Sequence, residues 1–363
     1  MPGATERLGV GILGTGRISD LHAIEYVENP RTEIVAVCDL DADAALDRAR
    51  LWGATPARAY ADWRDLLADP AVDAVEVLLP HHLHLEVGLA AIAAGKHLST
   101  QKPIAFTVAG ADEFIAAADA GMARGQVIRV FENLLSYPPI ARLLDVVRAG
   151  DLGDVLAVRQ KSLSGDPNWG WAVPEAAVAW RFDPDRCGGG PLTFDDGLHK
   201  FSIAWALLGV AAEVHAWIGT TATRAGDLDS PSVISFRWPG GAVGTLEVVN
   251  APALQIATHH YAQDDRVEVT GTHGVAWVNR GHGRLLEEPA LRVYRDGRVH
   301  DHVDLETGWE SSFVHATRDF IRAVHDGGPA LLSARDHRDV LSTALAAQQS
   351  ARIGRPVRPE EIK

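Results

Sequence analysis

Cysteine, positive charge and long apolar runs are all scarce in this sequence. Only Cys38 and Cys187 occur among 363 residues, too few for a disulfide framework and without zinc-site spacing. Acidic residues outnumber basic ones by 48 to 34, and the formal net charge of −14 argues against nucleic acid or an anionic membrane as a partner. No stretch is apolar for long enough to span a bilayer, and residues 1–8 contain no apolar signal region. We therefore expect a cytoplasmic location.

Histidine is frequent, but its distribution does not indicate a metal site. The 16 histidines cluster only at residues 81–84 and 259–260, and neither cluster comes with paired carboxylates at ligand spacing. We therefore expect no metal ion.

At this chain length two domains are the natural expectation.

The first third of the chain alternates between candidate strands and helices, which is typical of a doubly wound parallel sheet. An apolar run at residues 8–13 is followed by Gly-Thr-Gly-Arg-Ile-Ser at residues 14–19 and then by a helical segment. This is a variant of the dinucleotide fingerprint, in which one glycine makes the turn, the next lets a pyrophosphate approach, and the third position must be small. The helix N-terminus adds N–H groups and a positive dipole end. The expected cofactor-binding residues are Gly14, Thr15, Gly16, Arg17 and Ile18.

A second candidate strand, residues 33–38, ends at Asp39. This residue lies 20 positions beyond Ser19, where a carboxylate is expected to bind the adenosine ribose hydroxyls. Leu40 and Asp41 follow with no basic residue, so a 2′-phosphate would meet two negative charges. The sequence therefore favours NAD over NADP as cofactor. The alternative is a solvated aspartate at a strand end.

Lys102 follows another candidate strand, residues 96–100, and precedes Pro103. Ligands of open parallel sheets lie beyond the carboxyl ends of the strands. This topological position places Lys102 at the expected site, whereas a lone lysine is otherwise an ordinary surface charge.

The pattern changes near residue 150, where we expect the Rossmann domain, residues 1–150, to end. Alternating runs separated by turn signals then predict an α+β domain with a large, mostly antiparallel sheet over residues 151–363. Two closing helices, near residues 312–325 and 335–352, could pack back on the first domain.

A glycine-rich approach, residues 188–190, leads into a predicted buried helix that stops at Gly209. Its first turn holds Asp195 and His199, four residues apart and so on one face. A carboxylate beside an imidazole can take a proton and hold the resulting charge. Gly197 between them removes a side chain, so a flat group could approach closely. The alternative is a helix N-terminus whose aspartates cap the backbone.

The segment from residue 168 to residue 180 is unusually rich in tryptophan. Aromatic faces pack well on the apolar faces of sugar rings, so Trp169 and Trp180 are candidate substrate contacts. Packing in a core or an interface is an equally good explanation.

In this order, the motifs resemble the Gfo/Idh/MocA oxidoreductase family, and the resemblance covers nearly the whole chain. The residues that carry it are Gly11-Ile12-Leu13-Gly14-Thr15-Gly16, Asp39, Pro80 with His84, Ala94-Gly95-Lys96-His97, Gln101-Lys102-Pro103, Asn133 with Pro138, Gly150-Asp151-Leu152-Gly153, and Gly188-Gly189-Gly190 with Asp195, Gly197 and His199.

The resemblance implies a Rossmann domain and a second domain whose open sheet serves in homodimer or homotetramer contacts. It implies NAD(P)-dependent oxidation or reduction at a carbon of a sugar, glycoside or cyclitol. The roles that it implies are catalysis by Lys102, Asp195 and His199, cofactor contacts from Pro80, His84, Gln101 and Lys102, and a substrate contact from Asn133.

Two departures from the family pattern concern the site. Gln101 stands where the family usually has glutamate, which removes a charge beside the nicotinamide, and Ser202 stands where an acid is frequent. Asp196 and Lys200 are additional charged residues, and Asp196 could cap the helix or contact substrate. Two other functions stay open: a redox-neutral, NAD-dependent glycosidase on the same fold, and a non-catalytic protein that senses NAD or sugar.

Overall fold

The apolar run at residues 8–13 forms strand β1 (Leu8–Leu13), and all six of its residues are buried. In the computed structural model, which describes residues 7–54, 57–281 and 283–363, β1 is a central strand of a six-stranded parallel sheet with the order β3-β2-β1-β4-β5-β6. The other strands are β2 (Thr32–Cys38), β3 (Arg58–Tyr60), β4 (Ala74–Val77), β5 (His97–Gln101) and β6 (Ile128–Phe131). The predicted doubly wound sheet is confirmed.

Three helices of this unit begin at a capping side chain. Asp41, Asp62 and Thr107 each accept a hydrogen bond from a backbone N–H in the first turn of the helix that follows. The helices between the strands are α1 (Ser19–Glu28), α2 (Ala42–Leu51), α3 (Trp63–Ala68), α4 (His84–Ala93) and α5 (Val108–Met122).

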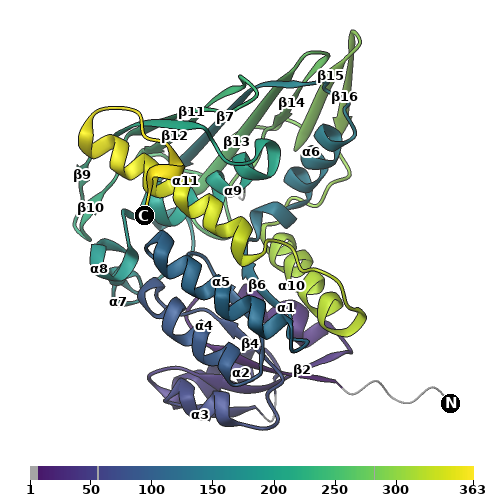
Figure 1. Ribbon diagram of the computed structural model, residues 1–363, viewed down its shortest axis with the longest axis vertical. Helices are drawn as coiled ribbons and strands as arrows, with labels where there is room; N and C mark the ends of the chain where they lie inside the picture. Colours follow the sequence, from purple (N-terminus) through teal and green to yellow (C-terminus); the bar gives the residue numbers. More distant parts are fainter. Residues whose placement is uncertain (1–6, 55–56, 282) are drawn as a thin grey trace, which may run out of the picture. The chain divides into compact units, whose positions relative to one another are not determined.

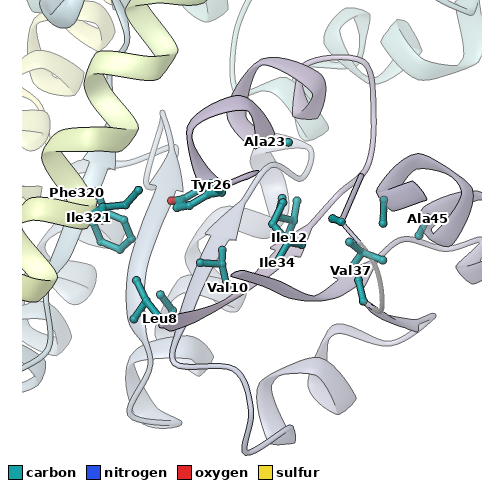
Figure 2. Packing of buried hydrophobic residues seen from close by; sticks show 14 residues of the cluster. Leu8, Val10, Ile12, Ala23, Tyr26, Ile34, Val37, Ala45, Phe320 and Ile321 are labelled. Carbon is teal, nitrogen blue, oxygen red and sulfur yellow. The ribbon is translucent and has the colours of Figure 1, made fainter. Parts of the chain in front are cut away.

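A distant part of the chain completes the core of this unit. Phe320 and Ile321, from α10 (Trp309–Asp326), pack with Leu8, Val10 and Tyr26 in one buried cluster (Figure 2). By compactness the first unit comprises Met1–Glu132 and Phe313–Arg338, and the second comprises Asn133–Ser312 and Asp339–Lys363. The domain division at residue 150 expected from the sequence stays a prediction.

The second unit contains an eight-stranded sheet with the order β16-β15-β14-β13-β7-β12-β11-β8 (Figure 1). Of its neighbouring pairs only β7 and β12 run parallel, so the sheet is mixed and mostly antiparallel, as expected. The strands are β7 (Val155–Ser164), β8 (Glu213–Ile218), β11 (Ser232–Arg237), β12 (Val243–Asn250), β13 (Gln263–Gly271), β14 (Gly274–Val278), β15 (Leu291–Arg295) and β16 (Arg298–His302).

Further elements of the second unit support the site. They are α6 (Pro138–Arg148), α7 (Glu175–Val178), α8 (Pro184–Cys187), α9 (Gly197–Leu208) and the short hairpin of β9 (Thr221–Ala222) and β10 (Asp227–Leu228). The boundary between the units falls within α11 (Ala334–Ile353). Within the described ranges, no helix combines the length and the apolar character needed to cross a membrane.

Candidate functional site

The turn after β1 has the conformation that only glycine adopts readily. Gly14 has φ of +95°, and its N–H donates to the carbonyl oxygen of Cys38 at 2.8 Å. A Cβ added to Gly14 would lie 2.6 Å from the carbonyl oxygen of Leu78, whereas a Cβ on Gly16 would meet nothing within 4 Å. Gly14 therefore shapes the turn, and Gly16 leaves open space beside it for a phosphate group.

Asp39 closes this turn from the neighbouring strand. Its carboxylate accepts hydrogen bonds from the N–H and the hydroxyl of Thr15, at 2.8 and 2.9 Å, and from the N–H of Leu40 at 2.8 Å. The anion is thus fixed at the carboxyl end of β2, beside the glycine turn. This arrangement fits NAD, whose ribose hydroxyls can donate to a carboxylate, better than NADP.

The third fingerprint position is a serine that completes the turn. Ser19 is fully buried, and its hydroxyl donates to the carbonyl oxygen of Gly16 at 2.6 Å. Ile18 precedes the first residue of α1, and Arg17 forms an ion pair with Asp20 at 3.2 Å. The backbone N–H groups at the start of α1 thus follow the turn directly, as an anion site requires.

Lys102 lies one residue beyond β5 and is buried, with 6% of its surface exposed. It precedes a cis peptide bond to Pro103. Because β1, β4 and β5 are parallel neighbours, the residues that follow them lie together along one edge of the sheet, the edge formed by the carboxyl ends of its strands. The lysine is therefore on the same sheet edge as the glycine turn.

His84 ties two of these strand ends together. Its Nδ1 lies 2.8 Å from the carbonyl oxygen of Pro103 and its Nε2 lies 2.7 Å from that of Leu79. Burial lowers the pKa of His84 to about 3, so the ring is neutral and one N–H donates to one carbonyl at a time. Pro80 precedes the 3₁₀ turn His81–Leu83, which leads into α4, the helix that begins at His84. His84, with no exposed surface, supports the turn that carries Lys102.

In the second unit, the three glycines let the chain fold tightly around Asp229. Gly188 has φ of +85° and ends α8, and a Cβ on Gly190 would lie 2.1 Å from an Asp229 carboxylate oxygen. That carboxylate accepts hydrogen bonds from the N–H of Leu192 at 2.8 Å and from the N–H and hydroxyl of Thr193. Asp229 therefore satisfies the free N–H groups at the start of the next helical turn.

The helix that carries Asp195 and His199 begins in a wider form than expected. Residues Pro191–Asp196 form a π-helical turn, and α9 follows from Gly197 to Leu208, with Gly209 as the predicted stop. Asp195 is buried and His199 is half-buried. Arg181 Nε donates to Asp195 Oδ2 at 2.7 Å, and its guanidinium lies over the Trp180 ring, 4.8 Å from the centroid. Asp195 is thus one half of an ion pair.

Asp195 favours the charged form of Arg181. Burial alone would lower the pKa of Arg181, but Asp195 outweighs this effect and raises the pKa, so the guanidinium stays charged. Arg181 was not predicted from the sequence, since the 14-residue separation from Asp195 corresponds to no regular spacing. The only available signal was its place directly after Trp180 in the tryptophan-rich segment.

The capping role considered for Asp196 is wrong. Its side chain makes no cap hydrogen bond to α9; instead, Asp196 accepts from Lys200 Nζ at 2.7 and 2.8 Å and from Gln263 and Ser162. Lys200 also pairs with Asp265 at 3.2 Å. Burial would raise the pKa of Asp196, but Lys200 and His199 outweigh it and lower the pKa to about 2. Asp196 is therefore an anion at neutral pH, and it belongs to a polar network with Lys200, Gln263 and Asp265.

The aromatic residues of the long loop divide into an exposed and a packed group. Trp169 is 49% exposed at the end of a 3₁₀ turn. Trp171 instead packs against His260, Tyr261 and Trp309, with ring centroids 4.8, 5.7 and 6.2 Å apart. An aromatic cluster built around Trp171 was not predicted.

Asn133 is buried, and its side-chain amide donates to the hydroxyl of Ser312 at 2.9 Å.

The predicted residues are thus divided between the two compact units. Lys102 and all of the predicted cofactor residues belong to the first unit, and Asp195, Asp196 and His199 belong to the second. Among the described residues, no group of three histidine, cysteine or acidic side chains could hold a metal ion.

Comparison with known families accounts for both units. Residues 8–128 match the model described as "Oxidoreductase family, NAD-binding Rossmann fold", and residues 140–277 match the Gfo/Idh/MocA C-terminal domain. The chain belongs to the Gfo/Idh/MocA family. It is therefore an oxidoreductase with an NAD-binding Rossmann fold, and the glycine turn and Asp39 are the features that fit the cofactor.

The relatives below can each be aligned with most of this chain. An uncharacterized oxidoreductase of Rhizobium meliloti is 30% identical over 72% of this chain and 71% of its own. The levoglucosan dehydrogenase of Pseudarthrobacter phenanthrenivorans is 25% identical over 95% and 96% of the two chains. Among solved structures, GenD2 from gentamicin A biosynthesis, in complex with NAD, has a TM-score of 0.79 and 26% identity over 97% and 96% of the chains.

Alanine at the two glycines should separate the shape of the turn from cofactor binding. We expect Gly14→Ala to lower the melting temperature, because the new Cβ meets the Leu78 carbonyl in a backbone conformation that costs roughly 1–2 kcal/mol for alanine. Gly16→Ala should leave the melting temperature unchanged and weaken NADH binding, measured by fluorescence titration. Unaltered NADH affinity in Gly16→Ala would remove Gly16 from the cofactor site.

Arg181→Met should weaken catalysis by removing the charged donor of Asp195. A hydrogen bond to a charged group contributes about 1.5–3 kcal/mol, so kcat/KM is expected to fall about 10- to 100-fold. Arg186→Met, five residues along and exposed, is the matched control. Equal kcat/KM in the two variants would show that the Arg181–Asp195 pair does not serve the reaction.

Proposed function

We propose that this protein oxidises a secondary hydroxyl of a sugar, glycoside or cyclitol with NAD, or reduces the corresponding ketone. The observation that carries the proposal is the buried Lys102 on the same sheet edge as the glycine turn and Asp39. The levoglucosan dehydrogenase relative supports a carbohydrate substrate.

In the proposed mechanism three side chains act on one substrate hydroxyl. His199 takes the hydroxyl proton, and the Lys102 ammonium stabilises the negative charge that develops on the oxygen. Asp195, fixed by Arg181, accepts a hydrogen bond from a substrate hydroxyl and orients the sugar. Bound NAD supplies the hydride acceptor. In the reverse direction, His199 or Lys102 returns the proton to the ketone oxygen.

Other side chains, besides the three that act on the hydroxyl, are proposed to line the substrate site. Trp169 has an exposed ring, and Trp180 stacks beneath Arg181, so both are proposed to lie against the sugar. Asn133 and Asp196 are also proposed as substrate contacts; in the structure each bonds to a protein group, Ser312 and Lys200 respectively.

We also propose a homodimer or homotetramer formed through the outer face of the large sheet. Buried and exposed residues alternate along its strands, and large apolar side chains remain exposed on the outer face. They are Trp217, Val233, Val243, Tyr294 and Val299. Soluble monomers rarely expose a contiguous apolar patch of large size, so this face is a candidate interface. A cytoplasmic location is part of the same proposal, supported by two buried cysteines that are not joined in a disulfide.

A panel of sugars, glycosides and inositols with NAD and NADP tests the proposal. We expect the absorbance of the reduced cofactor to rise when NAD is combined with at least one member of the panel. Release of aglycone from a glycoside without net NADH would instead indicate the redox-neutral glycosidase. Binding of NAD with neither reaction would support a sensing protein.

A further inference from the structure

The first unit contains a buried polar network that the proposed mechanism does not use. Glu76 lies in β4 with no exposed surface, and its carboxylate accepts hydrogen bonds from Tyr26 at 2.6 Å and Ser99 at 3.0 Å. His22 Nδ1, from α1, lies 3.1 Å from Glu76 Oε1, and Arg129 Nε donates to Ser99 at 2.9 Å. Apart from Arg129, at 1% exposure, these side chains are fully buried.

The charges of this network are well defined. Burial alone would raise the pKa of Glu76, but His22, Arg129 and the Tyr26 hydroxyl outweigh it and lower the pKa, so Glu76 is an anion. Burial and Glu76 raise the pKa of Tyr26, which keeps its hydroxyl protonated as a donor. On its other sides, the His22 ring contacts the rings of Phe131 and Phe313, with centroids 4.1 and 5.1 Å away. Its remaining nitrogen, Nε2, lies next to the side-chain amide of Gln101.

Gln101 connects the network to the lysine turn. Its Nε2 lies 2.9 Å from His22 Nε2, and it is the last residue of β5, directly before Lys102. With the amide nitrogen donating to a bare ring nitrogen, His22 carries its proton on Nδ1, facing Glu76. A carboxylate at position 101 could only accept.

We propose that His22 and Glu76 are positioning residues for Lys102, acting through the side chain of Gln101. The inference rests on the proposed catalytic role of Lys102. It also accounts for the departure from the family's glutamate: a carboxylate there would place a second negative charge around His22, opposite Glu76.

A double-mutant cycle with two readouts tests this proposal. The variants are His22→Phe, which keeps a ring between Phe131 and Phe313, Gln101→Leu, which removes only the last link, and the pair together. The first readout is the rate at which an amine reagent modifies Lys102 in the whole protein, followed by peptide mass spectrometry. Lys96, held by the carbonyl oxygens of Asp69 and Val72 in the same unit, is the internal reference.

We expect each single variant to speed modification of Lys102 about tenfold, and the double variant to add little, as for residues of one hydrogen-bond network. Independent effects that add in the double variant, or Lys102 rates equal to wild type in Gln101→Leu, would overturn the proposal. Ser99→Ala, which weakens the same cluster without touching the His22–Gln101 contact, should leave the Lys102 rate nearly unchanged. Since labelling needs no turnover, it decides this proposal even if the proposed reaction is not found.

The second readout compares kcat with KM. In the Gln101→Glu variant, we expect kcat to fall, because a carboxylate can only accept and cannot donate to the bare His22 Nε2. KM for substrate should change less than kcat. A Gln101→Glu variant with the kcat of the wild type would show that the amide has no such role.

Discussion

Lys102→Met is expected to lower kcat by about 10²–10⁴-fold. This is the range for a positioned group that transfers a proton or stabilises the negative charge developing on the substrate oxygen. The side chain is buried at the end of β5, so few water molecules could replace its charge. Methionine keeps much of the length and apolar stem, and the turn with Pro103 should survive. Steady-state kinetics on the substrate identified by the panel measures the effect.

The control for this prediction is Lys161→Met. Lys161 lies in β7 of the other unit, with 48% of its side chain exposed, and its nearest acidic oxygen is 4.0 Å away on Glu247. Its kcat should equal that of the wild type. A Lys102→Met enzyme with normal kcat would exclude Lys102 from the chemistry, and a changed melting temperature would indicate that the turn itself had collapsed.

Lys200→Met is expected to produce the largest loss of stability. Lys200 is the shared cation of Asp196 and Asp265, and 3% of its side chain is exposed. Removing one partner of a buried ion pair costs about 3–5 kcal/mol, because the remaining charges stay buried without compensation. Urea unfolding at pH 7 measures this loss. Lys161→Met is again the matched control, with an expected change of less than about 0.5 kcal/mol for an exposed position.

The pH dependence of unfolding tests the cause of this effect. In the wild type the pKa of Asp196 is lowered to about 2, so its ion pair stabilises the fold above the unfolded pKa near 4, and this stabilisation is lost as pH falls toward 2. Without Lys200 this contribution should disappear, and Asp196→Asn in the same chain should restore part of the lost stability. If Lys200→Met remained as stable as Lys161→Met at pH 7, the network would not support the fold.

Local patterns predicted the glycine turn and the strand beside it well. Gly14, Gly16 and Asp39 belong to a motif whose spacing is fixed by one strand–turn–helix–strand unit, and the structure joins Asp39 to Thr15 as that geometry requires. Strands buried on both faces, such as β1, appear as continuous apolar runs. The three-residue strand β3 and the hairpin of β9 and β10 were not predicted, since two or three residues carry no usable period.

The supporting contacts could not be predicted because they join distant residues. Asp229 meets Thr193 across 36 residues, and Gln101 meets His22 across 79. Each pair depends on the register of two separate elements, which a single sequence does not specify. The π-helical turn before α9 was also missed, because a period of 3.6 residues was assumed for the whole segment.

The interrupted first unit has a consequence for the synthesis of the protein. Its sheet comes from the first 132 residues, but Phe320 and Ile321 lie in its core, the Ala316 carbonyl accepts from Arg129, and Val130 donates to the Leu332 carbonyl. N-terminal domains commonly fold while the ribosome is still adding later residues. Here the nascent Rossmann sheet lacks part of its core until the chain through Leu332 has been synthesised.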